Sequence, residues 1–182
     1  MWKHLTHPNI VPLIGVTISP HQQLISDWMP GGNLCDHIKY NHGADRLGLV
    51  RAFRLRLFGT YSSHQLSDAA KGLEYLHSRN VIHGDLKGVS DCPENLVPLS
   101  MNILTPHQLN ILVDIVNDSP RVRLADFGVA IVTRNLKSIR PATREKNHTE
   151  RWAAPEVLSG ENASRESDVF SFAMVMVEVR HG

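Results

Sequence analysis

Three short strings hold the residues whose types and spacing could carry chemistry. They are HGDLK at residues 83–87, DFG at 126–128 and APE at 154–156. Their carboxylates Asp85 and Asp126 could accept a proton from a hydroxyl or hold a hard cation such as Mg²⁺. Lys87, two residues after Asp85, could neutralise negative charge on a phosphoryl group. Each string alone is a weak signal, because tripeptides of this kind also occur by chance.

Plainer interpretations of the same residues stay open. Asp85 could cap a turn, and Asp126 could be a β-turn residue before a glycine. The histidines are scattered without the spacing of a metal site, and no carboxylate or cysteine ligand accompanies the pair at positions 4 and 7. No zinc site is therefore predicted.

The hydrophobic pattern predicts the elements that must position these strings. In chain order they are a strand over 10–18, a strand over 22–29, a helix from Leu34 capped by Asn33, a helix over 66–77, strands over 111–114 and 122–126, and an apolar helix over 169–179 opened by Ser167 and Asp168. The second helix has apolar residues at helical spacing, namely Leu66, Ala70, Leu73 and Leu76. The order lacks the βαβα alternation of a doubly wound sheet, and it predicts an α+β fold.

Composition and charge restrict the class of protein. Of 182 residues, 42% are hydrophobic and 20% are charged, which is typical of a soluble globular chain of about one domain. The chain has 19 Lys and Arg against 18 Asp and Glu, so its charge indicates neither nucleic acid nor an anionic membrane as a partner. The longest apolar stretch, 169–179, is too short to span a membrane. Cys35 and Cys92 form no CxxC motif and no signal peptide begins the chain, so a cytoplasmic location is predicted.

In this order the three strings resemble those of a eukaryotic protein kinase. The resemblance extends from Trp2 to the last residue. HPNIVPLIG resembles the link into the fourth strand, LISDWMPGGNL the hinge, LSDAAKGLEYLHSRNVIHGDLK the catalytic helix and loop, and SDVFSFAMVMVEV the central helix of the large lobe. DLK and RWAAPE are most similar to the tyrosine-kinase-like group of Ser/Thr kinases. The resemblance implies a protein-kinase-like α+β fold, mainly the helical large lobe with the hinge and remnant small-lobe strands.

The resemblance also implies roles for individual residues. A protein kinase transfers the γ-phosphoryl group of ATP, and the protein contributes mainly positioning and charge neutralisation. Asp85 would accept or orient the proton of the substrate hydroxyl, and Lys87 would neutralise charge on the transferred group. Asp126 would bind Mg²⁺, with Asn110 as a second, amide ligand. The implied cofactors are ATP and Mg²⁺.

The same resemblance places the nucleotide at the hinge. The backbone of Asp27 and Met29 would hydrogen-bond the adenine ring. Ser26 would be the small gatekeeper residue, and Leu112 would form a floor under the base.

Asn110 is displaced from the position that the family pattern gives to the metal-binding amide. That position is 90, which is a serine here, so the amide lies twenty residues farther along. Removing residues 90–109 would restore the motif as HGDLKGVNILVD, whereas Asn102 is a weaker candidate. Residues 90–109 and 58–65 are therefore predicted to be insertions, the latter interrupting a helix.

Other parts of the family pattern are expected to lie outside this sequence. The glycine-rich loop, the strand lysine and the helix glutamate would lie upstream of Met1, and the later helices beyond Gly182. The chain is predicted to be one partial kinase domain over 1–182. Residues 1–29 would be the remnant of the small lobe with the hinge, and residues 30–182 an incomplete large lobe.

Three functional interpretations follow from these observations. The first is a Ser/Thr protein kinase that acts on protein substrates with ATP and Mg²⁺. The second is a catalytically inactive, pseudokinase-like module that binds a scaffold or a full-length kinase. The third is an incomplete gene product without a settled fold. Neither nucleic acid nor a membrane is a predicted partner.

Overall fold

The computed structural model describes the chain in six segments. They are residues 2–19, 23–41, 60–88, 110–126, 131–132 and 151–181. The predicted insertion at 90–109, the alternative ligand Asn102 and residues 127–128 of the DFG string lie outside the described residues.

Helices and short antiparallel strands make up the described chain. The elements are η1 (Trp2–His4, a 3₁₀ turn), β1 (Leu13–Thr17), β2 (Gln23–Ser26), α1 (Leu34–Asn41), α3 (Thr60–Ser78), β3 (Val81–Ile82), β4 (Ile111–Val116), β5 (Ser119–Leu124), β6 (Ile131–Val132), α4 (Pro155–Leu158) and α5 (Arg165–His181). The strands form three two-stranded antiparallel sheets, β1–β2, β3–β6 and β4–β5. The predicted α+β fold class is confirmed, and each predicted strand and helix has a counterpart.

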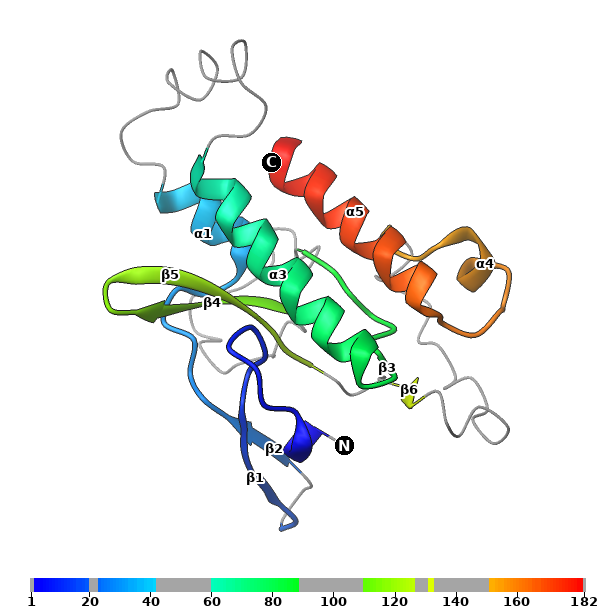
Figure 1. Ribbon diagram of the computed structural model, residues 1–182, viewed down its shortest axis with the longest axis horizontal. Helices are drawn as coiled ribbons and strands as arrows, with labels where there is room; N and C mark the ends of the chain where they lie inside the picture. Colours follow the sequence, from blue (N-terminus) through cyan, green and yellow to red (C-terminus); the bar gives the residue numbers. More distant parts are fainter. Residues whose placement is uncertain are drawn as a thin grey trace, which may run out of the picture.

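Two long helices and one hairpin form the centre of the molecule. In Figure 1, α3 and α5 lie side by side, and the β4–β5 hairpin crosses α3 on the side away from α5. The β1–β2 hairpin extends away from this centre, next to η1. The fully buried apolar side chains of the main core come from these central elements, from α1 and from the segments between elements, and include Ile10, Leu34, Leu76, Leu86, Ile111, Leu124, Trp152 and Val175. Among the described residues, no helix combines the length and apolarity that crossing a membrane requires.

The start of α1 is fixed by its N-cap, as predicted. The Asn33 side-chain oxygen accepts a hydrogen bond from the Asp36 backbone N–H at 2.8 Å, and the Asn33 amide donates back to the Asp36 carboxylate. This reciprocal pair satisfies a backbone N–H that the first helical turn leaves without a partner.

The β4–β5 hairpin turns tightly at Asn117 and Asp118. Their φ values of 51° and 59° are left-handed, as a two-residue type I′ turn requires and as Asn and Asp tolerate. The strands therefore run up to the turn on both sides, whereas the sequence predicted an end at residue 114 and a restart at 122.

Helix α3 begins earlier than the sequence predicted. It starts at Thr60, so residues 60–65 of the predicted interruption are helical; residues 58 and 59 lie outside the described residues. The reason is that the buried stripe continues through Gln65, which is 2% exposed, and then through Ala69 and Leu73. Ala70, one of the apolar residues at helical spacing, is exposed.

A close approach between α3 and the N-terminal segment fixes the position of β5. The Asn9 amide donates to the Val122 carbonyl at 2.8 Å, and the Leu124 N–H donates to the Asn9 carbonyl at 2.9 Å. A Cβ atom on Gly72 would lie 2.7 Å from the same Asn9 carbonyl oxygen and 3.2 Å from the Leu124 side chain. Glycine at position 72 is therefore what lets the helix pack this closely.

This packing predicts an unusual sign for a glycine-to-alanine substitution. Alanine usually stabilises a helix interior by about 1 kcal/mol relative to glycine. We expect Gly72→Ala to lower the free energy of unfolding instead, by about 1–3 kcal/mol, because the new methyl overpacks against a backbone oxygen. Urea denaturation measures the change, with Ser67→Ala on the exposed face of α3 as the control. An unchanged or increased stability of Gly72→Ala would contradict the close approach.

Candidate active site

The loop at residues 83–88, which follows β3, contains the HGDLK string. Strand β3 is too short to be recognised from sequence, and it forms because Val81 and Ile82 pair with Val132 and Ile131 of β6. Both β3 residues are 3% exposed, so the loop leaves the core at a fixed point. We refer to this segment as the 83–88 loop.

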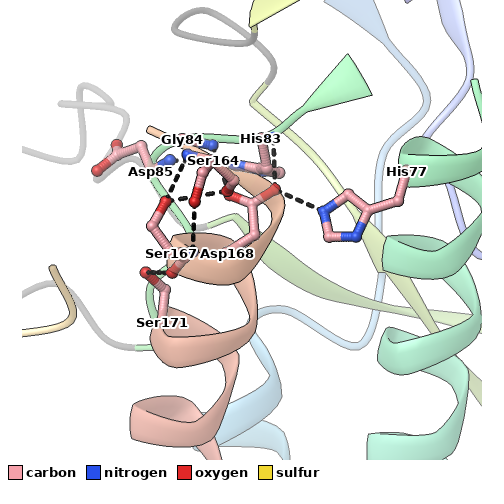
Figure 2. A network of polar contacts seen from close by, with 8 residues as sticks. All are labelled: His77, His83, Gly84, Asp85, Ser164, Ser167, Asp168 and Ser171. Carbon is pink, nitrogen blue, oxygen red and sulfur yellow. Dashed lines mark hydrogen bonds and ion pairs between the residues drawn. The ribbon is translucent and has the colours of Figure 1, made fainter. Parts of the chain in front are cut away.

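A buried carboxylate on α5 binds the backbone at the start of this loop. Asp168, which is 1% exposed, accepts hydrogen bonds from the His83 N–H at 2.9 Å and the Gly84 N–H at 2.8 Å. The His77 ring nitrogen Nε2 on α3 lies 2.8 Å from the same carboxylate. Figure 2 shows these contacts converging at the first turn of α5. The sequence predicted Asp168 only as a first-turn helix residue, since nothing local indicates partners about 85 residues away.

The first turn of α5 is itself capped, which fixes the backbone that carries Asp168. The Ser167 N–H donates to the Ser164 hydroxyl oxygen at 3.0 Å, and the Ser164 N–H donates to the Ser167 hydroxyl oxygen at 2.8 Å. The N-terminal end of a helix favours negative charge, so the site suits a buried carboxylate. Figure 2 places Asp85 beyond this turn, on the loop that the carboxylate binds.

Asp85 and Lys87 form an ion pair within the 83–88 loop. The Lys87 Nζ atom lies 3.2 Å from an Asp85 carboxylate oxygen, and the two side chains are 9% and 14% exposed. A charge-assisted contact of this kind, shielded from water, holds the lysine head group beside the carboxylate. The structure therefore brings these two predicted residues together.

Asn110 joins the loop to the β4–β5 hairpin. Its side-chain Nδ2 donates to the Asp85 carbonyl oxygen, and its backbone carbonyl accepts from the Ala125 N–H at 2.9 Å. Because a carbonyl can only accept, the amide is oriented with Nδ2 towards Asp85. Asn110 is fully buried, and its Oδ1 atom has no hydrogen-bond partner among the described residues.

Asp126 directly follows Ala125, whose backbone is bound by Asn110 and by His83. The His83 ring nitrogen Nε2 donates to the Ala125 carbonyl at 2.9 Å, so the 83–88 loop contacts the end of the hairpin a second time. Asp126 itself has φ 56°, a left-handed conformation that is uncommon outside glycine and is concentrated at functional sites. The sequence placed it at the end of a strand, whereas β5 ends two residues earlier.

The predicted hinge residues lie against this end of the hairpin. Met29 is buried in a small cluster with Val11 and Ala125, and Leu112 packs against that cluster. Asp27 is exposed. Met29 and Leu112 are thus brought together next to the residue that precedes Asp126.

Backbone hydrogen bonds join the hinge to β4. The Gly31 N–H donates to the Val113 carbonyl at 2.9 Å, and the Val113 N–H donates to the Gly32 carbonyl at 2.8 Å. A Cβ atom on Gly31 would lie 2.7 Å from the Val113 side chain, so glycine is needed at this contact. The hinge is therefore fixed to the same strand that carries Leu112.

Two hollows border these elements. A small one lies between the 83–88 loop and the segment before α4, and its lining includes Asp85, Leu86, Trp152 and Ala154. An open groove of about 490 Å³ lies elsewhere, between the N-terminal segment and α3, and is lined by residues such as His7, Lys71 and Tyr75. The groove shares no lining residue with the predicted site.

The unpartnered Oδ1 atom of Asn110 tests whether the site suits a magnesium ion. A buried oxygen without a partner costs about 1–3 kcal/mol, and a hard cation that prefers oxygen ligands would remove that cost. Magnesium is usually bound by one or two protein oxygens together with phosphate and water, so a dense carboxylate cluster is not needed. The Asn110 amide and the Asp126 carboxylate fit this ligand type.

The comparisons with known proteins agree with the predicted resemblance. The family model for the protein kinase domain matches residues 1–182. Serine/threonine-protein kinase STY46 from Arabidopsis thaliana is 30% identical over 181 residues, which are 99% of this chain and 25% of that protein. Serine/threonine/tyrosine-protein kinase HT1 from the same plant is 31% identical over 178 residues, 97% of this chain and 36% of that protein.

A human relative gives a similar result. Mitogen-activated protein kinase kinase kinase 1 from Homo sapiens is 29% identical over 184 residues, 98% of this chain and 10% of that protein. The chain therefore spans about a third or less of the length of these relatives. The two plant relatives are named as a serine/threonine kinase and a serine/threonine/tyrosine kinase, which agrees with the Ser/Thr kinase that the sequence predicted.

Removing the negative charge at position 168 is expected to destabilise the fold. In Asp168→Asn, the amide NH₂ group would face at least one of the N–H groups that now donate to the carboxylate, so two donors would point at each other. We expect a loss of about 3 kcal/mol or more in the free energy of unfolding, the cost of breaking a buried charge network. Denaturation followed by circular dichroism measures it.

The matched control for this variant is Asp118→Asn, which makes the same chemical change in the exposed β4–β5 turn. Exposed substitutions usually change stability by less than about 0.5 kcal/mol. A loss in Asp168→Asn no larger than that of the control would show that the carboxylate does not stabilise the loop.

Proposed function

Because this chain belongs to the protein kinase domain family, we propose that it transfers the γ-phosphoryl group of ATP to Ser and Thr hydroxyls of protein substrates. The observation that carries the proposal is the position of the buried Asn110, whose side-chain amide donates to the Asp85 carbonyl and whose backbone carbonyl accepts from the N–H of Ala125, the residue before Asp126. Asp85, Asn110 and Asp126 are the three residues that the resemblance assigned to proton handling and metal binding, and they come from the 83–88 loop and from the two ends of the β4–β5 hairpin.

The metal and nucleotide sites follow from the same contacts. Asn110 Oδ1 and the Asp126 carboxylate are the proposed ligands for Mg²⁺, which would neutralise charge on the phosphates when bound. The backbone of Asp27 and Met29 is proposed to bind the adenine edge, with Leu112 below the ring. The packing of Met29 and Leu112 beside Ala125 supports this placement.

The Asp85–Lys87 pair supports the proposed chemistry. Phosphoryl transfer needs little covalent chemistry from the protein and depends on positioning and charge. The Asp85 carboxylate would orient the attacking hydroxyl and accept its proton, while Lys87 Nζ, 3.2 Å away, would balance negative charge on the transferred group. An arrangement that keeps these groups together favours an enzyme over a catalytically inactive binding module.

Location and further partners belong to the same proposal. We place the protein in the cytoplasm, because its two cysteines lie far apart in the sequence and make no disulfide framework, which fits a reducing compartment. A scaffold or a full-length kinase is the proposed further partner. It is supported by apolar side chains exposed on α5, of which Val169 is 56% and Val177 51% exposed.

Nucleotide binding gives the first test of this proposal. A ligand at about 100 times its dissociation constant stabilises a folded protein by about 2.7 kcal/mol. We expect ATP with Mg²⁺ to raise the midpoint of thermal unfolding, and the effect to fall sharply when Mg²⁺ is omitted. In Asp126→Asn the magnesium-dependent part should disappear, whereas Asp118→Asn should respond as the original chain does. A chain that shows no shift with either mixture would remove the proposed function.

Phosphorylation of a Ser/Thr peptide gives the second test. General acid–base groups contribute about 10²–10⁴-fold to rate, so we expect Asp85→Asn to lower kcat by that factor with little change in the KM for ATP. Asp118→Asn should retain the original kcat. Equal rates for Asp85→Asn and the original chain would contradict the role assigned to Asp85.

A further inference from the structure

The open groove beside α3 lies outside the proposed catalytic site. Its volume is about 490 Å³, within the roughly 300–1,000 Å³ that ligand sites in proteins occupy. Three separate parts of the chain line it, namely the N-terminal segment at 7–9, α3 and β5. We call this feature the α3 groove. A ligand bound in it would not occupy the small hollow at Asp85, because the two share no lining residue.

Two stacked rings line the α3 groove. The ring centroids of His7 and Tyr75 lie 4.7 Å apart, with 16° between the ring planes. The Tyr75 hydroxyl oxygen accepts a hydrogen bond from the Thr6 N–H at 3.0 Å, and the Arg79 guanidinium lies 5.5 Å from the Tyr75 ring centroid. These contacts hold the rings in place before a ligand binds, which lowers the entropic cost of binding.

The tautomer of His7 adds a hydrogen-bond donor to this lining. The His7 Nδ1 atom accepts a hydrogen bond from the Asn9 N–H at 3.1 Å. Burial lowers the pKa of His7, and the carboxylates of Asp68 and Glu74 oppose this only in part, so the ring is neutral near pH 7. A neutral imidazole that accepts at one nitrogen has its hydrogen on the other. The Nε2 atom of His7 is therefore an N–H donor.

Arg121 brings a partly buried positive charge to the α3 groove. In the β4–β5 hairpin it lies opposite Asp114. The Asp114 carboxylate pairs with Arg123 instead, at 3.0 Å from its Nε atom and 2.9 Å from a terminal nitrogen. Among the residues that the structure describes, none pairs with the Arg121 guanidinium. A guanidinium that is partly withdrawn from water without an acceptor favours an anion that it can bind through two parallel hydrogen bonds.

The remaining charges of the α3 groove favour an anion with a single charge. Lys71 and Asp68 already pair, with the Lys71 Nζ atom 3.3 Å from a carboxylate oxygen. Glu74, farther along α3, is exposed and needs no partner because water solvates it. Arg121 is thus the cation that remains for a ligand. One carboxylate would satisfy it, whereas the second charge of a phosphate would be repelled by Glu74 without a cation of its own.

We propose that the α3 groove binds an acidic segment of a partner protein. The carboxylate of an Asp or Glu side chain in that segment would pair with the Arg121 guanidinium and accept a further hydrogen bond from His7 Nε2. The neighbouring residues of the segment would pack against the His7 and Tyr75 rings. The inference goes beyond the proposed function, because this binding needs neither ATP nor a phosphoryl acceptor.

Peptide libraries test the proposal without a known partner sequence. Each library has the form acetyl-XXZXX-amide, where X is any uncharged residue and Z is Glu, Gln, phosphoserine or Arg. Each is titrated into the isotope-labelled full chain without nucleotide, and NMR follows the backbone amide signals of Asn9, Tyr75 and Arg121. We expect the Glu library to shift these signals and to reach saturation at the lowest concentration, because one carboxylate matches the cation that remains in the groove.

Substitutions in the groove supply the controls. Arg121→Gln should weaken binding of the Glu library by about tenfold or more, since a charge-assisted hydrogen bond is lost. Glu74→Gln should tighten binding by about two- to fivefold, the effect of one exposed charge, and misfolding cannot produce such a gain. Arg151→Gln removes an exposed arginine outside the groove and should bind as the original chain does.

Several outcomes would overturn the proposal. It fails if the Glu library shifts these signals no more than the Gln library does, or if Arg121→Gln binds the Glu library as tightly as Arg151→Gln does. Tighter binding of the phosphoserine library would assign the groove to a phosphorylated ligand, and tighter binding of the Arg library would assign it to a basic one. Either result contradicts an acidic segment. Because no measurement here depends on phosphorylation, the result is independent of the proposed function.

Discussion

A buried carboxylate must accept hydrogen bonds from protein donors in place of water. At Asp168 this requirement organises the centre of the molecule. The donors are two consecutive backbone N–H groups at the start of the 83–88 loop and the His77 ring on α3. Desolvating a carboxylate is costly unless such partners are present, so these contacts stabilise the arrangement in which the loop, α3 and α5 pack together. The direction in which the chain leaves His83, and therefore the position of Asp85, follows from that arrangement.

A second set of contacts brings the other half of the site to this loop. Asn110 binds the Asp85 carbonyl, and His83 binds the Ala125 carbonyl, so the β4–β5 hairpin meets the 83–88 loop at two points. The hinge is attached to the same hairpin through Val113, and Met29 packs beside Ala125. Groups from three distant segments thus converge without any covalent link between them, which is the positioning that phosphoryl transfer depends on.

The sequence was informative where a feature depends on neighbouring residues. The Asn33 cap, the tight turn before β5 and the DFG and HGDLK strings could each be recognised from a few adjacent letters, and the motif also selected Asn110 over Asn102. Features that depend on distant partners could not be recognised. Strand β3 exists only through its pairing with β6, and Asp168 has a role only through the loop that it binds. The start of α3 was missed because Gln65 is polar yet buried on the core-facing stripe.

The central claim is that Asp85, Asn110 and Asp126 surround a metal–nucleotide complex. The most direct measurement uses Mn²⁺ in place of Mg²⁺, because its unpaired electrons broaden the NMR signals of nearby nuclei. With Mn²⁺ and ATP bound to the isotope-labelled chain, the account predicts that the backbone amide signals of these three residues broaden while that of Asp118 stays sharp. Broadening that spares all three residues, or that affects Asp118 equally, would contradict it.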